Sequence, residues 1–88
     1  MSMDNEPPSP EETLGQFNRL IREVLRGQMN RNTFRPWEVE LLLDIESCNL
    51  RESSKEGVLR RYQKAVQRQL DRGATAPMML SEFLKRKP

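Results

Sequence analysis

The sequence predicts an all-α fold: a small three-helix bundle with a short C-terminal helical element and a disordered N-terminal tail. Three segments repeat apolar residues at the spacing of helices buried on one side, and none alternates as a strand does. Each of the three opens with residues typical of a helix start. A chain of 88 residues has the length of one domain. We therefore expect a disordered tail over residues 1–8 and a single helical domain over residues 9–88.

The first helix is expected over about residues 10–28. Ser9 is a good N-cap residue, Pro10 suits the first helical position, and Glu12 stands where it would complete a capping box with Ser9. Apolar residues occupy about half of the helix circumference. Three arginines lie together on the opposite side: Arg19, Arg22 and Arg26. A polar connection, GQMNRNT, follows.

The second helix is expected over about residues 36–48. Pro36 suits its first position and Glu38 its third. Arg35 is a poor N-cap side chain, which leaves Thr33 as another candidate for the cap. A short helix that is apolar on most sides is usually central in a bundle, and we expect that place for this one.

The polar and apolar residues of the second helix suggest different surroundings for its two sides. We expect Trp37 to anchor the helix in the bundle and Cys48 to lie in the core. Glu40, Asp44 and Ser47 form the one continuous polar strip, which we expect to be exposed.

The third helix is expected over about residues 54–72. Ser53 and Glu56 have the spacing of a capping box, and Gly73 is a typical C-cap residue. After a break at ATAP, a short helical element is expected over residues 80–85. That element either folds back to cap the bundle or serves as an anchor for the groove of a partner.

Five basic residues share the side of the third helix opposite its apolar arc: Arg60, Arg61, Lys64, Arg68 and Arg72. One interpretation is that, with the arginines of the first helix, they bind nucleic acid or an acidic protein surface. A second is that they only solvate the helix. A third is that they pair with acids of the second helix, at about 0–1 kcal/mol for each exposed pair. No aromatic residue lies among these bases, which argues against a stacking platform for single strands.

A candidate apolar interface combines residues from two segments. Val39 and Leu43 lie away from the side of the second helix that carries Trp37, so they are the apolar residues most readily left exposed. The C-terminal element adds three candidates: Leu80, Phe83 and Leu84. We expect a homodimer or a protein-partner site through Val39 and Leu43.

Composition narrows the function further. The chain has no histidine, one cysteine and a net charge of +2, and it shows no catalytic triad, phosphate loop or metal-ligand set. We therefore expect no enzyme, no cofactor and no membrane segment. An acidic, proline-containing N-terminus unlike a secretory signal predicts a cytoplasmic protein. The leading hypothesis is a protein-interaction module of the regulatory-adaptor kind. The alternative is a nucleic-acid-binding regulator that uses the basic faces of the first and third helices.

The helix assignment predicts which side chains support the fold. Leu41→Ala should lower the free energy of unfolding by about 2–4 kcal/mol, because it leaves a cavity in the core. Arg61→Ala should change it by less than about 0.5 kcal/mol, as is usual for an exposed residue. Chemical denaturation measures both. Equal effects of the two changes would show that the apolar and basic sides are wrongly assigned.

Overall fold

The computed structural model describes residues 9–27, 32 and 34–86 of the chain. Four helices follow one another: α1 (Pro10–Arg26), α2 (Pro36–Ser47), α3 (Glu52–Asp71) and α4 (Leu80–Lys85). No strand occurs among the described residues, and the all-α prediction is confirmed. The tail expected over residues 1–8 lies outside the described residues.

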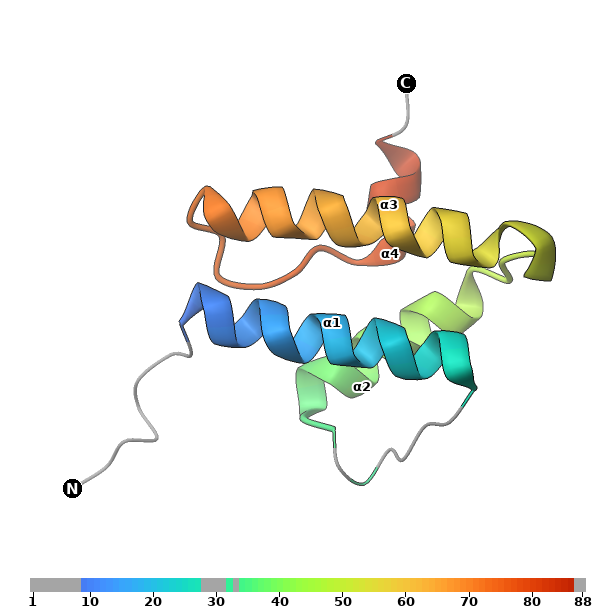
Figure 1. Ribbon diagram of the computed structural model, residues 1–88, viewed down its shortest axis with the longest axis horizontal. Helices are drawn as coiled ribbons and strands as arrows, with labels where there is room; N and C mark the ends of the chain where they lie inside the picture. Colours follow the sequence, from blue (N-terminus) through green and yellow to red (C-terminus); the bar gives the residue numbers. More distant parts are fainter. Residues whose placement is uncertain (1–8, 28–31, 33, 87–88) are drawn as a thin grey trace.

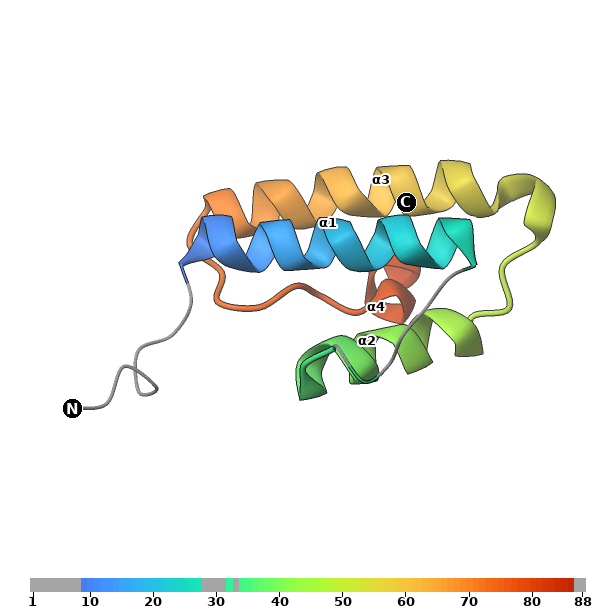
Figure 2. The ribbon, with the colours of Figure 1, turned by 60° about the horizontal axis from the view of Figure 1, so that its bottom comes forward.

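The helices form two layers. α1 and α3 lie side by side and run in opposite directions, and α2 crosses beside them (Figure 1). Figure 2 shows α2 and α4 together on the other side of the α1–α3 layer. α2 packs against α1 and α4, and α4 packs against α2 and α3. The expectation that α2 is central is wrong, because none of the other described helices covers its outer side, where Leu43 is exposed.

The core lies between the layers and takes fully buried side chains from all four helices. They include Phe17, Leu20 and Ile21 of α1, Leu41 and Leu42 of α2, Leu59, Tyr62 and Val66 of α3, and Leu80 of α4. The Tyr62 ring meets Phe17 edge to face, with centroids 5.2 Å apart, and lies 5.6 Å from the Phe83 ring. Such aromatic pairs add about 0.5–1.5 kcal/mol to the stabilisation from area burial.

The first two helices start where the sequence suggests. The Ser9 hydroxyl accepts a hydrogen bond from the Glu12 N–H at 3.1 Å. The N-cap of α2 is Arg35, whose own N–H donates to a carboxylate oxygen of Glu38 at 2.8 Å. The alternative cap, Thr33, lies outside the described residues. α1 ends at Arg26 because Gly27 adopts a left-handed conformation, with φ of 71°.

The third helix starts earlier than predicted. α3 begins at Glu52, so Ser53 and Glu56 both lie inside the helix and the expected capping box does not form. Glu56 instead pairs with Arg60 one turn further on, at 2.8 Å. The local spacing fits a cap and an i, i+4 ion pair equally well, and the position of the preceding turn decides between them.

The C-terminal element folds back onto the bundle. Leu80 is fully buried, while Phe83 and Leu84 are partly buried against the core. The candidate interface is therefore corrected at Leu80, which is not available to a partner. The spacing of its apolar residues predicted an apolar face but not what that face packs against. In the structure α4 packs against α2 and α3.

Polar contacts hold this segment in place. Asp44 of α2 accepts two hydrogen bonds from Ser81 of α4, from its N–H at 3.0 Å and from its hydroxyl at 2.8 Å. The Tyr62 hydroxyl donates to the Met78 carbonyl, and the Met78 N–H donates to the Gln69 side-chain oxygen at 3.0 Å. Asp44, expected on an exposed strip, is therefore half-buried and caps α4, where the helix dipole favours a negative charge.

Burial also sets the chemistry of two core side chains. It raises the pKa of the Tyr62 hydroxyl well above its usual value, with smaller effects from Asp44 and Cys48. Burial likewise raises the pKa of the Cys48 thiol, and the charge of Asp44 adds to the rise. Cys48 packs against the core but stays partly exposed, and its raised pKa keeps the thiol protonated at neutral pH.

The contact between Asp44 and Ser81 can be tested by mutation. Asp44→Ala should lower the free energy of unfolding by about 1–3 kcal/mol, because it leaves the partly buried Ser81 donors without their acceptor. Amide hydrogen exchange should quicken in α4 first. Glu40→Ala is the matched control on the exposed side of the same helix, with an effect below about 0.5 kcal/mol. Unchanged exchange in α4 of the Asp44 variant would contradict this role.

The raised pKa of Tyr62 predicts how stability depends on alkaline pH. Its contribution should be fully present below about pH 10, the pKa of an exposed tyrosine, and should fall above that pH, because the unfolded chain then loses a proton that the folded chain keeps. Tyr62 is the only tyrosine in the sequence, so ultraviolet absorbance reports its ionisation alone. Tyrosinate should appear together with unfolding, and Tyr62→Phe should remove this part of the pH dependence. Ionisation near pH 10 with the circular dichroism unchanged would disprove the prediction.

Candidate functional site

A hollow lined mainly by charged residues lies where the end of α1 meets the start of α3. It has a volume of about 610 Å³. It is lined by Arg22, Val24, Leu25, Arg26 and Gly27 from α1 and its cap, and by Glu52, Lys55, Glu56 and Arg60 from α3. A second hollow of about 310 Å³ shares Arg22, Leu25 and Arg60 with the first and extends it to Asn18 and Gln63. Together they form a continuous depression, here named the α1–α3 groove.

The antiparallel packing of two helices creates this groove. The side-chain amide of Gln63 donates to the side-chain oxygen of Asn18 at 3.1 Å and fixes how the two helices align. Because the helices are antiparallel, the C-terminal part of α1 lies beside the N-terminal part of α3 (Figure 1). The last turns of α1, which carry Arg22 and Arg26, therefore lie beside the first turns of α3, which carry Glu56 and Arg60.

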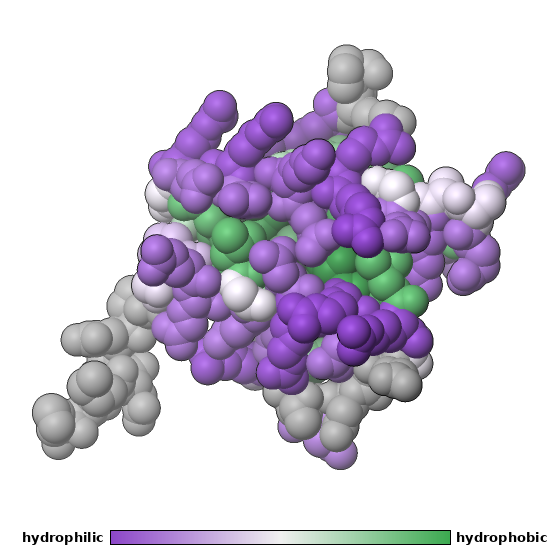
Figure 3. All heavy atoms as spheres, viewed as in Figure 1, coloured by the Kyte–Doolittle hydropathy of each residue, from purple (hydrophilic) through white to green (hydrophobic). Residues whose placement is uncertain are grey.

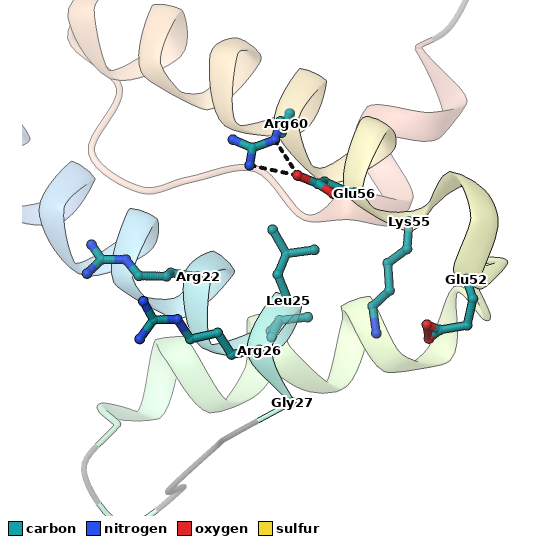
Figure 4. A pocket seen from close by; sticks show the side chains of 9 residues that line it. Arg22, Leu25, Arg26, Gly27, Glu52, Lys55, Glu56 and Arg60 are labelled. Atoms are coloured by element: carbon teal, nitrogen blue, oxygen red, sulfur yellow. Dashed lines mark hydrogen bonds and ion pairs between the residues drawn. The ribbon is translucent and has the colours of Figure 1, made fainter.

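Charge is distributed unevenly along the groove. Arg22 and Arg26 extend to one side of Leu25, while Lys55 and Glu52 lie on the other side (Figure 4). Across from them, Arg60 donates two hydrogen bonds to one carboxylate oxygen of Glu56, at 3.0 and 2.8 Å. Four cationic side chains and two carboxylates thus face the same hollow, which leaves it net positive.

The floor of the groove is apolar. Leu25 is partly buried and packs against the core, and Val24 next to it in α1 is buried. In the space-filling view of Figure 3, hydrophobic surface shows between the hydrophilic rows that cover α1 and α3. A ligand in the groove would therefore meet an apolar floor between charged walls.

The predicted basic residues do not form one patch. Arg22, Arg26 and Arg60 line the α1–α3 groove. Arg61 lies on the other flank of α3, where it lines a small apolar hollow of about 140 Å³ with Val58, Phe83 and Leu84. Sequence spacing placed Arg60 and Arg61 on one broad side of the helix, and the packing of α1 and α4 on its two flanks separates them.

The remaining basic residues lie elsewhere. Arg68 and Arg72 line a hollow of about 420 Å³ near the end of α3, together with Arg86. Arg19 pairs with Glu23 at 3.2 Å, and its guanidinium carbon lies 5.5 Å from the centre of the Phe34 ring. Lys64 is exposed on the outer side of α3.

Two of the acids of α2 have partners other than the bases of α3. Glu38 accepts from the backbone of Arg35, and Asp44 accepts from Ser81. Arg60 pairs with Glu56 of its own helix. These contacts go against the interpretation in which Arg60 pairs with an acid of α2.

The apolar candidates differ in exposure. Leu43 is 49% exposed, and it is the one large apolar side chain in the exposed class among the described residues. Val39 is partly buried, as is Trp37 at the start of the helix. Phe83 and Leu84 show one side to the small hollow beside Arg61.

Sequence reasoning missed several residues of the groove. Glu56 was assigned to a cap, and Leu25, Glu52 and Lys55 carried no expectation as site residues. An alternation of acids and bases at Glu52, Lys55, Glu56 and Arg60 was visible in the sequence. It became a site only when the end of α1 was placed beside it.

Metal-binding groups, membrane-spanning helices and similarity to known proteins give no further indication of what the groove binds. Over residues 9–27, 32 and 34–86, no three or more His, Cys, Asp or Glu side chains are grouped so that they could hold a metal ion. Within the same residues no helix has both the length and the apolar character needed to cross a membrane. No family model, curated protein or solved structure matches the chain.

Proposed function

We propose that this protein is a small, non-enzymatic helical interaction module of the regulatory-adaptor kind, which binds another protein through the α1–α3 groove. The observation that carries the proposal is the composition of the groove. An apolar floor at Leu25 lies between walls that hold both signs of charge. Protein surfaces offer apolar anchors and mixed charges of this kind, and their charge pattern selects the partner.

The exposure of the charged groups argues against catalysis in the groove. Catalytic groups act most strongly where water is excluded and their positions are fixed. The side chains of Arg60 and Glu56 are 63% and 65% exposed, so water screens them and their ion pair holds them only weakly. Such groups suit the surface of a binding site that exchanges water for a partner.

The carboxylates favour a protein ligand over a nucleic acid. Glu52 and Glu56 face the same hollow as the arginines and offer partners for basic side chains, which a protein carries and a phosphate backbone lacks. No aromatic side chain lines the hollow to stack on a base. Arginine side chains match carboxylates with two parallel hydrogen bonds, which suits acidic side chains of a protein.

Nucleic-acid binding is retained as the second candidate for one reason. Arg22 and Arg26 come from the basic face of α1 and Arg60 from that of α3, and they lie along one groove. Three phosphate contacts would give a slope of roughly −3 for log K against log salt on duplex DNA, at about −0.9 for each contact. A steep salt dependence of this kind would support the alternative.

A cytoplasmic location forms part of the proposal. The described core is built without a disulfide, since the chain has a single cysteine. A fold that needs no disulfide suits a reducing compartment.

To test the proposal, peptides that bind the intact protein are selected from a displayed peptide library. Selected peptides should combine an apolar residue with neighbouring acids. The double change Arg22→Glu with Arg26→Glu should weaken their binding by about tenfold or more, equivalent to at least about 1.4 kcal/mol. Both residues are exposed, so the fold should be unaffected.

Matched controls separate the groove from general charge. Arg68→Glu with Arg72→Glu changes net charge equally but at the other end of α3, and it should leave peptide binding nearly unchanged. Fluorescence anisotropy with duplex DNA over a range of salt measures the alternative. Equal loss in both double variants, or tight DNA binding with a slope near −3, would count against the protein-binding proposal.

A further inference from the structure

One side of α2 forms a stripe that none of the described helices covers. Pro36, Glu40, Leu43 and Ser47 are spaced by four, three and four residues, so they lie on one side of the helix, and all four are exposed. Leu43 lies near the middle of this outer stripe with nearly half of its surface open. An apolar side chain this exposed in an otherwise polar surface is typical of an interface.

The charge of α2 is one-sided. From Pro36 to Cys48 the sequence has four acids, Glu38, Glu40, Asp44 and Glu46, and no base. Glu38 and Asp44 accept backbone hydrogen bonds within this chain. Glu40 lies three residues before Leu43, on the same exposed stripe. The outer stripe therefore offers an apolar side chain with a carboxylate beside it.

The α1–α3 groove offers the complementary surface. Its floor is Leu25, and Arg22 and Arg26 extend to one side of that residue. Along α1 it runs from Asn18 to Gly27, about 14 Å at 1.5 Å per residue. The twelve residues of α2 span about 18 Å, so a helix of this length covers the whole groove.

We infer that the groove is occupied by α2 of a second copy of this chain. Leu43 of one copy packs on Leu25 of the other, and Glu40 faces Arg22 and Arg26. The inference rests on the proposed function only in using the groove as a binding site. The contact joins two unlike surfaces, the outer stripe of one copy and the groove of another. Because each copy carries both surfaces, it can insert its own α2 and also bind the α2 of another copy. The contact combines apolar burial with opposite charges, so salt should weaken it without abolishing it.

The experiment is sedimentation equilibrium of the full chain from low to high micromolar concentration. The wild type should self-associate, and the apparent Kd should rise with salt. Leu43→Asp removes the apolar anchor. The double change Arg22→Glu with Arg26→Glu reverses the charge of these two positions in the groove. Each variant should raise the Kd by about tenfold or more, the effect of losing about 1.4 kcal/mol. Arg68→Glu with Arg72→Glu is the control of matched charge and should associate like the wild type.

Mixing the two defective variants gives the decisive measurement. The Leu43→Asp chain keeps a working groove, and the Arg22→Glu, Arg26→Glu chain keeps a working α2. One intact contact remains between unlike chains, so the mixture should form a complex that neither variant forms alone. Circular dichroism of each variant checks that it is folded.

The outcomes separate this inference from the proposed function. A wild type that stays monomeric at high micromolar concentration overturns the inference, and acidic peptides that still bind the groove would then leave the proposed function standing. Self-association that mixing does not restore also overturns it, because the contact then lies elsewhere. If the groove binds duplex DNA more tightly than it binds α2 of a second copy, both the inference and the proposed function are overturned.

Discussion

Tyr62 joins three of the four helices and the segment before the last. Its ring packs on Phe17 of α1 and Phe83 of α4, and its hydroxyl donates to the carbonyl of Met78. A buried tyrosine needs a partner for its hydroxyl, and here the partner belongs to the chain that leads into α4. The central core contact therefore also fixes the C-terminal segment.

The position of that segment decides which apolar surfaces remain outside. With α4 held between α2 and α3, Leu80 is buried and Phe83 is half-covered. α4 has only six residues, which is too few to cover the outer side of α2 as well. Leu43 stays exposed for this reason. A small chain has limited surface with which to cover itself, and what stays uncovered is then available to a partner.

The α1–α3 groove depends on a different feature, the alignment of two antiparallel helices. Shifting α3 by one turn along α1 would place Arg60 and Glu56 beside other residues, so the Asn18–Gln63 hydrogen bond has a positioning role. The Arg60–Glu56 ion pair in the groove contributes little to stability because both side chains are exposed. Stability is concentrated in the core, and the proposed binding surface lies at the edge of the helix pair, so substitutions of its charged groups should cost the fold little.

The sequence determined the number and kind of helices, since caps and apolar spacing act over a few residues. Ser9, Pro36 and the side of α3 that carries Tyr62 were readable in this way. Three matters were decided by tertiary structure: the start of α3, the role of Asp44 and the division of the basic residues. Asp44 looked exposed because its partner, Ser81, lies 37 residues away in the chain. The basic residues share one side of a helix in the sequence, but α1 and α4 pack on its opposite flanks and separate Arg60 from Arg61. Local patterns show which side of a helix is apolar, and only packing between distant segments shows what each side faces.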